Sequence, residues 1–271
     1  MNDWKRCTPN FKCGICDHDS WCQMGNQGWL CMRNESPHTI TFSDGQSGWF
    51  HPFDGPRIPK CPIPARQEPN LPRPDFRRLI ETWSSAMDPA RIIGLAGQLG
   101  VAAWSLVALG ACWSETHGAW AFPMSDERGE VIGIRLRYEN GIKRAVLGSR
   151  NGLFIPEMEP ERRLFVCEGP SDCAACLSLG IWAVGRPSCS ACGPMLAEFI
   201  VRNKVREAVI LADSDRPGID GADRLELPCR STVLLPPAAK DVRESVALGC
   251  TRELLESNLR GQVWKQPSGT L

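Results

Sequence analysis

Acidic residues follow three short apolar segments in the C-terminal half of the chain. Glu168 and Asp172 come after LFVC, Asp213 and Asp215 after AVILA, and Asp241 after TVLLPP. If these segments are strands of a parallel sheet, their carboxyl ends meet at one edge and bring the acids together. Clustered carboxylates repel one another unless a divalent cation neutralises them, and hard oxygen ligands suit Mg²⁺ or Mn²⁺. The pattern therefore predicts one or two such ions and the chemistry of phosphoryl transfer.

Cysteines are concentrated near the N-terminus. Two of them have the Cys-Xaa2-Cys spacing of a zinc knuckle, and two more can complete a tetrahedral set: Cys13, Cys16, Cys22 and Cys31. Cys7 and His18 are alternative ligands. A segment this short and polar cannot build a stable apolar core, so it needs a metal to hold it together. We predict one structural zinc ion at the four cysteines.

Two further Cys-Xaa2-Cys pairs lie in the C-terminal half, Cys173 with Cys176 and Cys189 with Cys192. The first pair falls in a predicted helix, where cysteine is often a small buried packing residue. The second pair lies in a turn rich in serine, glycine and proline. We favour this packing interpretation over a second zinc site.

Basic residues gather between positions 135 and 150, where five cations accompany one acid. On a strand, Arg135 and Arg137 are two positions apart and share one face. Such clusters bind phosphate groups with little base selectivity, whereas the alternative is an ordinary solvated sheet face. We predict a nucleotide- and nucleic-acid-binding set of Arg135, Arg137, Lys143, Arg150 and Lys240. Near the cysteines, Trp21 and Trp29 either stack on bases or form the small core of that module.

Apolar periodicity predicts the elements that position these groups. Strands are expected at 119–122, 131–138 and 143–146, and Asp75 and Asp88 mark the starts of two earlier helices. After residue 163, strands at 164–167, 182–184, 208–212 and 232–235 alternate with helices near 171–179, 191–202, 219–226 and 251–259. This alternation predicts an α/β fold with a mainly parallel sheet, preceded by a small α+β basic subdomain.

Composition divides the chain into four parts. We expect a zinc-ribbon-like module at 1–50, a linker with eight prolines at 51–74, the basic subdomain at 75–160 and the parallel-sheet domain at 161–271. Lysine and arginine together number 31, as do aspartate and glutamate, so the net charge is zero and gives no hint of a partner. We find no membrane-spanning segment and no signal peptide, and we expect a cytoplasmic protein.

The acidic motifs resemble those of the TOPRIM domain shared by bacterial primases, topoisomerases and related nucleases. ADSDRPGIDGADRL is similar to the primase form of the second motif, and KDVRESVALGCTRELLESNL resembles the segment that closes the fold in phage and plasmid primases. The resemblance implies that Glu168 is a general acid/base or a metal ligand and that Asp213 and Asp215 are the main metal ligands. Asp172 and Asp241 would support a second metal. Many primases carry another acid where this chain has Arg243, which weakens the second site.

Two more segments extend the resemblance. CGICDHDSWCQMGNQGWLC resembles the zinc modules of mobile-element and phage primases, and GEVIGIRLRYENGIKRAVLGSRNGLF resembles the subdomain that binds template phosphates and the incoming nucleotide. The resemblance implies a DNA primase that makes short primers on single-stranded DNA from nucleoside triphosphates. The printed sequence has no GxxxxGK[ST] P-loop, so a replicative helicase would be a separate protein.

Two other functions remain open. TOPRIM proteins with a zinc module include non-catalytic DNA-binding scaffolds of recombination or replication, although the acids at 168, 213 and 215 are all present here. A TOPRIM nuclease would use the same metal ions, with water as the nucleophile. A topoisomerase is disfavoured because the only tyrosine, Tyr138, falls inside a predicted strand.

Overall fold

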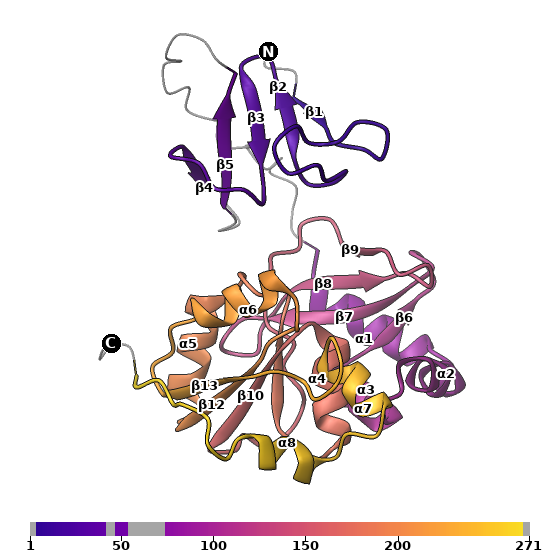
Figure 1. The fold of residues 1–271 in the computed structure, drawn as a ribbon. Coiled ribbons are helices and arrows are strands. Elements are labelled where there is room, and N and C mark those ends of the chain that lie inside the picture. The colour runs from indigo at the N-terminus through magenta and orange to yellow at the C-terminus, as the bar shows by residue number, and fades with distance from the viewer. Residues whose placement is uncertain (1–3, 42–46, 54–73, 268–271) are drawn as a thin grey trace. The chain divides into compact units, whose positions relative to one another are not determined.

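The computed structural model describes residues 4–41, 47–53 and 74–267. The chain divides into two compact units, Met1–Leu71 and Pro72–Leu271 (Figure 1). Most of the proline-rich linker expected at 51–74 lies outside the described residues. In the described ranges, no helix is both long enough and apolar enough to cross a bilayer.

The first unit is a five-stranded antiparallel sheet. Its strands are β1 (Lys5–Arg6), β2 (Gln23–Gly25), β3 (Gly28–Cys31), β4 (Thr39–Thr41) and β5 (Ser47–Pro52), in the order β1-β2-β3-β5-β4. The strands are too short for a periodic apolar pattern, which is why the sequence predicted the module but not its strands. β5 continues two residues past the expected boundary at residue 50.

The second unit begins with three helices, α1 (Phe76–Ala86), α2 (Pro89–Leu99) and α3 (Ala103–Ala108). The predicted caps are confirmed, because the Asp75 side chain accepts from the backbone N–H of Arg78 and the Asp88 side chain from that of Ala90. An antiparallel sheet follows, with β6 (Cys112–Ser114), β7 (Ala119–Ser125), β8 (Val131–Arg137) and β9 (Lys143–Ala145) in sequential order. The three strands expected here are present, and β6 was not predicted.

The rest of the unit alternates strands with helices, as expected. The strands are β10 (Arg163–Glu168), β11 (Ala183–Arg186), β12 (Glu207–Leu211) and β13 (Arg230–Leu234), all parallel in the order β11-β10-β12-β13. The helices are α4 (Pro170–Ser178), α5 (Gly193–Arg202), α6 (Arg216–Asp223), α7 (Val242–Ala247) and α8 (Arg252–Asn258). Only α7 was missed, because six residues are too few to show a helical period.

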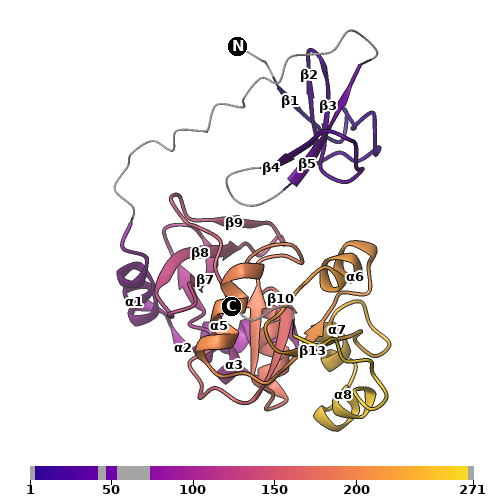
Figure 2. The same ribbon diagram turned by 90° about the vertical axis from the view of Figure 1, so that its left-hand side faces the viewer.

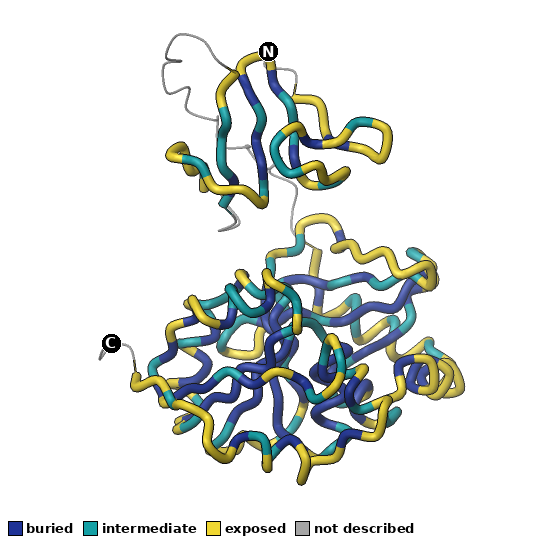
Figure 3. The backbone as a smooth tube through the Cα atoms, viewed as in Figure 1, coloured by how far each residue is buried: buried dark blue, intermediate teal, exposed yellow. Residues whose placement is uncertain are grey.

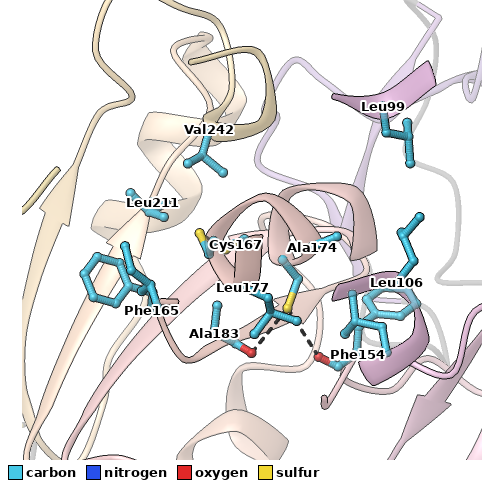
Figure 4. Packing of buried hydrophobic residues seen from close by; sticks show 14 of the residues in the cluster. Leu99, Leu106, Phe154, Phe165, Cys167, Ala174, Leu177, Ala183, Leu211 and Val242 are labelled. Atoms are coloured by element: carbon cyan, nitrogen blue, oxygen red, sulfur yellow. Dashed lines mark hydrogen bonds between the residues drawn. The ribbon is translucent and has the colours of Figure 1, made fainter. Parts of the chain in front are cut away.

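Apolar side chains cover both faces of the parallel sheet. Along β10, Phe165 and Cys167 belong to one core cluster, whereas Leu164 and Val166 belong to another. Helices cover the sheet on both sides, as the two ribbon views show (Figures 1 and 2), and most residues of its strands are buried (Figure 3). Figure 4 shows part of the first cluster, which includes Leu177 of α4 and Leu106 of α3. Burial on both faces explains why these strands are short uninterrupted apolar runs.

The two sheets of this unit are connected by residues 153 and 154. Leu153 forms a bridge with Ser125 at the end of β7, and Phe154 forms one with Gly185 of β11. Phe154 is almost fully buried in the first core cluster. The domain boundary expected at residue 160 therefore lies between the antiparallel and the parallel sheet. Residues 153 and 154 connect these two sheets, which belong to one compact unit.

Candidate active site and zinc centre

Glu168 is the last residue of β10, at the carboxyl edge of the parallel sheet. Its atom Oε1 is buried, and no described residue gives it a hydrogen bond. Burial raises the pKa of Glu168, and the charge of Asp213 raises it further, while a hydrogen bond from Cys189 and the charge of Arg186 oppose this. A buried carboxylate oxygen without a partner fits a cation ligand.

Asp213 and Asp215 follow β12 at the same edge. Burial and the charges of Asp241 and Asp215 raise the pKa of Asp213, whereas Lys240 and Lys143 lower it. Asp215 is the N-cap of α6, where Oδ1 accepts from the Gly218 N–H at 3.0 Å. Its Oδ2 lies 3.6 Å from Nζ of Lys240. The turn thus holds both acids at the start of one helix.

Asp172 and Asp241 form a second pair beside the first. Asp172 lies in the first turn of α4 and is buried, and burial together with the charges of Asp241 and Asp213 raises its pKa to about 7. Arg243 contacts both acids, since its backbone N–H donates to Asp172 at 3.3 Å and its Nη2 donates to Asp241 at 3.5 Å. The guanidinium of Arg243 therefore lies beside Asp241, one of the two acids expected to support a second metal ion.

The five acids are neighbours without forming a closed coordination set. Over the described ranges, the only group of three or more His, Cys, Asp or Glu ligand atoms gathered within 4.8 Å is that of the N-terminal cysteines. Asp215 and Asp241 are instead held by helix caps and by cations. The oxygen-only donor set, the free Oε1 of Glu168 and the mutual charge repulsion nevertheless fit Mg²⁺ or Mn²⁺.

The predicted basic residues differ in their surroundings. The charge of Lys143 acts on Asp213, and the charges of Arg243 and Asp172 act on Arg137, so these cations lie beside the acids. Arg135 donates to Asn151 at 3.3 Å, and its buried Nε has no partner among the described residues. Arg150 is exposed, and no described contact joins it to the acids. The structure thus brings Lys143, Arg137 and Lys240 to the carboxylates.

Sequence reasoning missed Arg186 and the turn that follows it. Arg186 is the register partner of Glu168 on the neighbouring strand and is 4% exposed. Its guanidinium donates to the carbonyls of Ala191 at 2.9 Å and Cys189 at 2.7 Å, which fixes the turn that carries Cys189 toward Glu168. A lone arginine at a strand end gives no sequence signal, because the partners are backbone carbonyls.

The four cysteines expected to bind zinc come together in the first unit. The Sγ atoms of Cys13, Cys16, Cys22 and Cys31 all lie within 4.8 Å of one another. Backbone N–H groups donate to two of them, from Met32 to Cys22 at 3.4 Å and from Asn34 to Cys31 at 3.2 Å. These bonds favour thiolates, so the cluster fits a structural zinc ion.

The alternative zinc ligands lie outside the cysteine cluster, and the tryptophans Trp21 and Trp29 differ in their exposure. Cys7 and His18 are outside the four-sulfur group, and His18 is exposed. Trp29 packs against the cysteine cluster and stacks on Phe11, with ring centroids 5.7 Å apart. Trp21 is 69% exposed. Trp29 therefore belongs to the small core of the module, and Trp21 remains available to a ligand.

The two other Cys-Xaa2-Cys pairs, Cys173 with Cys176 and Cys189 with Cys192, are not part of a metal-ligand cluster among the described residues. Cys173 is fully buried and donates to the carbonyl of Ala183 at 3.2 Å, while Cys176 lies 3.5 Å from the sulfur of Cys167. Cys189 instead contacts Glu168. The packing interpretation agrees with these contacts.

Comparison with known proteins identifies solved structures that have a similar fold. No protein-family model and no curated protein matches the sequence. Among solved structures, the DnaG catalytic core is 16% identical with a TM-score of 0.55, covering 70% of this chain and 79% of that one. The DnaG primase catalytic domain bound to single-stranded DNA is 16% identical with a TM-score of 0.56, covering 69% and 77%.

A third solved structure includes a zinc-binding domain. The Aquifex aeolicus primase, with its zinc-binding and RNA polymerase domains, is 15% identical with a TM-score of 0.57, covering 70% of this chain and 60% of that one. At these identities the similarity establishes the fold. The chain has the α/β fold of the primase catalytic core, and the structures it is similar to are those of DnaG-type primases.

Proposed function

We propose that this protein is a DNA primase, a nucleotidyltransferase that joins nucleoside triphosphates into a short primer on single-stranded DNA. The observation that carries the proposal is the group of acids at the carboxyl edge of the parallel sheet, where the charge of one raises the pKa of the next. The fold of the primase catalytic core gives that group its context. A DnaG catalytic domain that was solved with single-stranded DNA supports the choice of template.

Two sets of residues divide the work at this site. Asp213 and Asp215, with Glu168, would hold magnesium or manganese, and the bound ion would supply positive charge that neutralises the triphosphate. Lys143 and Arg137 bind and orient the triphosphate, because phosphate groups need cations near the carboxylates. Glu168 has two alternative roles, either as a further ligand of that ion or as the general base that accepts the proton of the attacking hydroxyl.

The first unit would engage the template. Its cysteine cluster fits a structural zinc ion, which holds the five-stranded sheet together. Lys5, Lys12 and Arg33 provide positive charge on this unit, and the exposed ring of Trp21 can stack on a base. An affiliation with phage or plasmid primases belongs to the same proposal, on the strength of the sequence resemblance. So do the cytoplasmic location and the separate helicase partner expected from the sequence.

Primer synthesis on single-stranded DNA tests the proposal. The substitution Asp213→Asn keeps the size of the side chain and removes the charge that holds the cation. We expect labelled primers from the unaltered protein with Mg²⁺ or Mn²⁺, and a loss of at least about a hundredfold in Asp213→Asn. The matched control is Asp220→Asn on α6, whose surface pair with Arg216 contributes little, so its activity should be unchanged.

The other functions predict different products. Shortening of the DNA without primer synthesis, lost in Asp213→Asn, would identify a nuclease. Binding of DNA with neither product, unaffected by Asp213→Asn, would identify a scaffold. Either result would refute the primase proposal.

A further inference from the structure

A cleft lies at the edge of the parallel sheet where the strands begin, opposite the edge that carries the carboxylates. Its volume is about 380 Å³, and it is lined by Arg163, Glu207, Arg230, Glu256, Leu259, Arg260 and Trp264. The strands are parallel, so this edge is separated from Glu168 by the length of β10, roughly 17 Å for six residues. In both ribbon views α8, which borders the cleft, lies at the end of the sheet away from α6 (Figures 1 and 2). A ligand bound here would not touch the carboxylates.

Three lining residues are in register across neighbouring strands. Arg163 of β10 is the partner of Glu207 of β12, which is the partner of Arg230 of β13. Glu207 accepts from Nη2 of Arg163 at 2.7 Å, from its Nε at 3.0 Å and from Nη1 of Arg230 at 3.5 Å. One carboxylate thus fixes two guanidinium groups, each of which keeps unused N–H donors.

The far wall of the cleft is fixed to the edge of β13. Lys265 and Ser231 exchange backbone hydrogen bonds of 2.7 and 3.1 Å, and the Thr232 hydroxyl donates to the carbonyl of Val263 at 2.8 Å. Between these points the guanidinium of Arg230 lies over the Trp264 ring, 4.9 Å from its centroid. The backbone of this wall is therefore held in place before a ligand binds.

The cleft has an excess of positive charge. Its lining holds three arginines and two glutamates. Glu256 is already paired with Arg252, which is not part of the lining, at 2.9 Å. No described residue forms an ion pair or hydrogen bond with the guanidinium of Arg260. An anion with more than one negative charge would therefore find unpaired positive charge here.

We propose that this cleft binds a nucleotide through its phosphate groups. Arginine forks match the geometry of phosphate oxygens, and guanidinium planes stack on nucleic-acid bases. The cleft is too large for a single phosphate ion and lies within the usual range of about 300 to 1,000 Å³ for small-molecule sites. The nucleotide is either a free triphosphate or one unit of a DNA strand, since both offer the same phosphate and base.

Binding to the 271-residue chain without divalent ions tests the proposal. ATP is titrated by calorimetry, a fluorescein-labelled oligothymidylate is titrated by anisotropy, and hydrogen exchange locates each ligand. We expect ATP or the oligonucleotide to protect amides in residues 259–265. The substitution Arg260→Gln, alone and with Arg230→Gln, should weaken that binding about tenfold or more, because each removes charge-assisted hydrogen bonds.

The controls separate this site from the carboxylates. Arg128→Gln removes another exposed arginine, on a turn of the antiparallel sheet, and should leave binding unchanged. Asp213→Asn should abolish primer synthesis while the protection of 259–265 persists, so the two proposals fail independently. Protection by ATP alone identifies the free nucleotide, and protection by the oligonucleotide alone identifies a strand. If neither ligand protects these amides, or if Arg260→Gln binds as tightly as the unaltered protein, the inference is wrong.

Discussion

Gly218 tests whether the turn after β12 sets the position of Asp213. A Cβ added at Gly218 would lie 2.6 Å from the carbonyl oxygen and 2.9 Å from the Cβ of Asp213. Ordinary contact begins near 3.4 Å, so Gly218→Ala must move the Asp213 backbone or the first turn of α6 by about 0.8 Å. A misplacement near 1 Å at a catalytic group costs roughly a hundredfold in rate. We expect kcat for primer synthesis to fall by about that factor.

Stability should change much less than activity. Alanine is about 1 kcal/mol more favourable than glycine inside a helix, which offsets part of the roughly 1–3 kcal/mol cost of overpacking. Thermal unfolding followed by circular dichroism measures the difference. The matched control is Gly97→Ala in α2, where an added Cβ meets nothing within 4 Å. That variant should retain full activity and be slightly more stable. A folded Gly218→Ala protein with unaltered kcat would refute the claim that this turn positions Asp213.

Two further predictions concern the zinc cluster and the core. Cys13→Ser should lower the bound zinc from one ion per chain toward none in metal analysis, whereas Cys173→Ser should leave it at one; an unchanged value for Cys13→Ser would contradict the assignment. Leu177→Ala should lower the free energy of unfolding by about 2–5 kcal/mol in denaturant titrations, because this side chain is fully buried. Val107→Ala, at a position that is 58% exposed, should change it by less than about 0.5 kcal/mol.

The sequence was most informative where local chemistry determines structure. Asp75 and Asp88 were recognised as helix caps because a cap depends only on the next two or three residues. The strands of the parallel sheet were recognised because burial on both faces leaves short uninterrupted apolar runs. The cysteine cluster was recognised from spacing, because one Cys-Xaa2-Cys pair and two nearby cysteines supply the four ligands of a structural zinc ion.

The features that were missed depend on contacts between distant segments. Arg186 acts through carbonyls of the following turn and through its register with Glu168, and neither is encoded in residue type. The distal cleft requires Arg163, Glu207 and Arg230 to be aligned across three strands, which only the strand order provides. Strand register is set by packing of the whole sheet, so a sequence pattern cannot predict it.

Two of the acids at the carboxyl edge, Asp215 and Asp241, are held in place by contacts with neighbouring groups. Asp215 and Asp241 each use one oxygen to cap a helix and direct the other toward a cation, Lys240 or Arg243. The caps fix the positions of these carboxylates, because the N–H groups that they bind belong to the first turns of helices α6 and α7. The cations are on flexible side chains and can leave. The oxygens that now face Lys240 and Arg243 are therefore the ones that could bind a divalent ion, while the caps keep the carboxylates in place. Lys240, once displaced from Asp215, would be free to bind a triphosphate at the same edge.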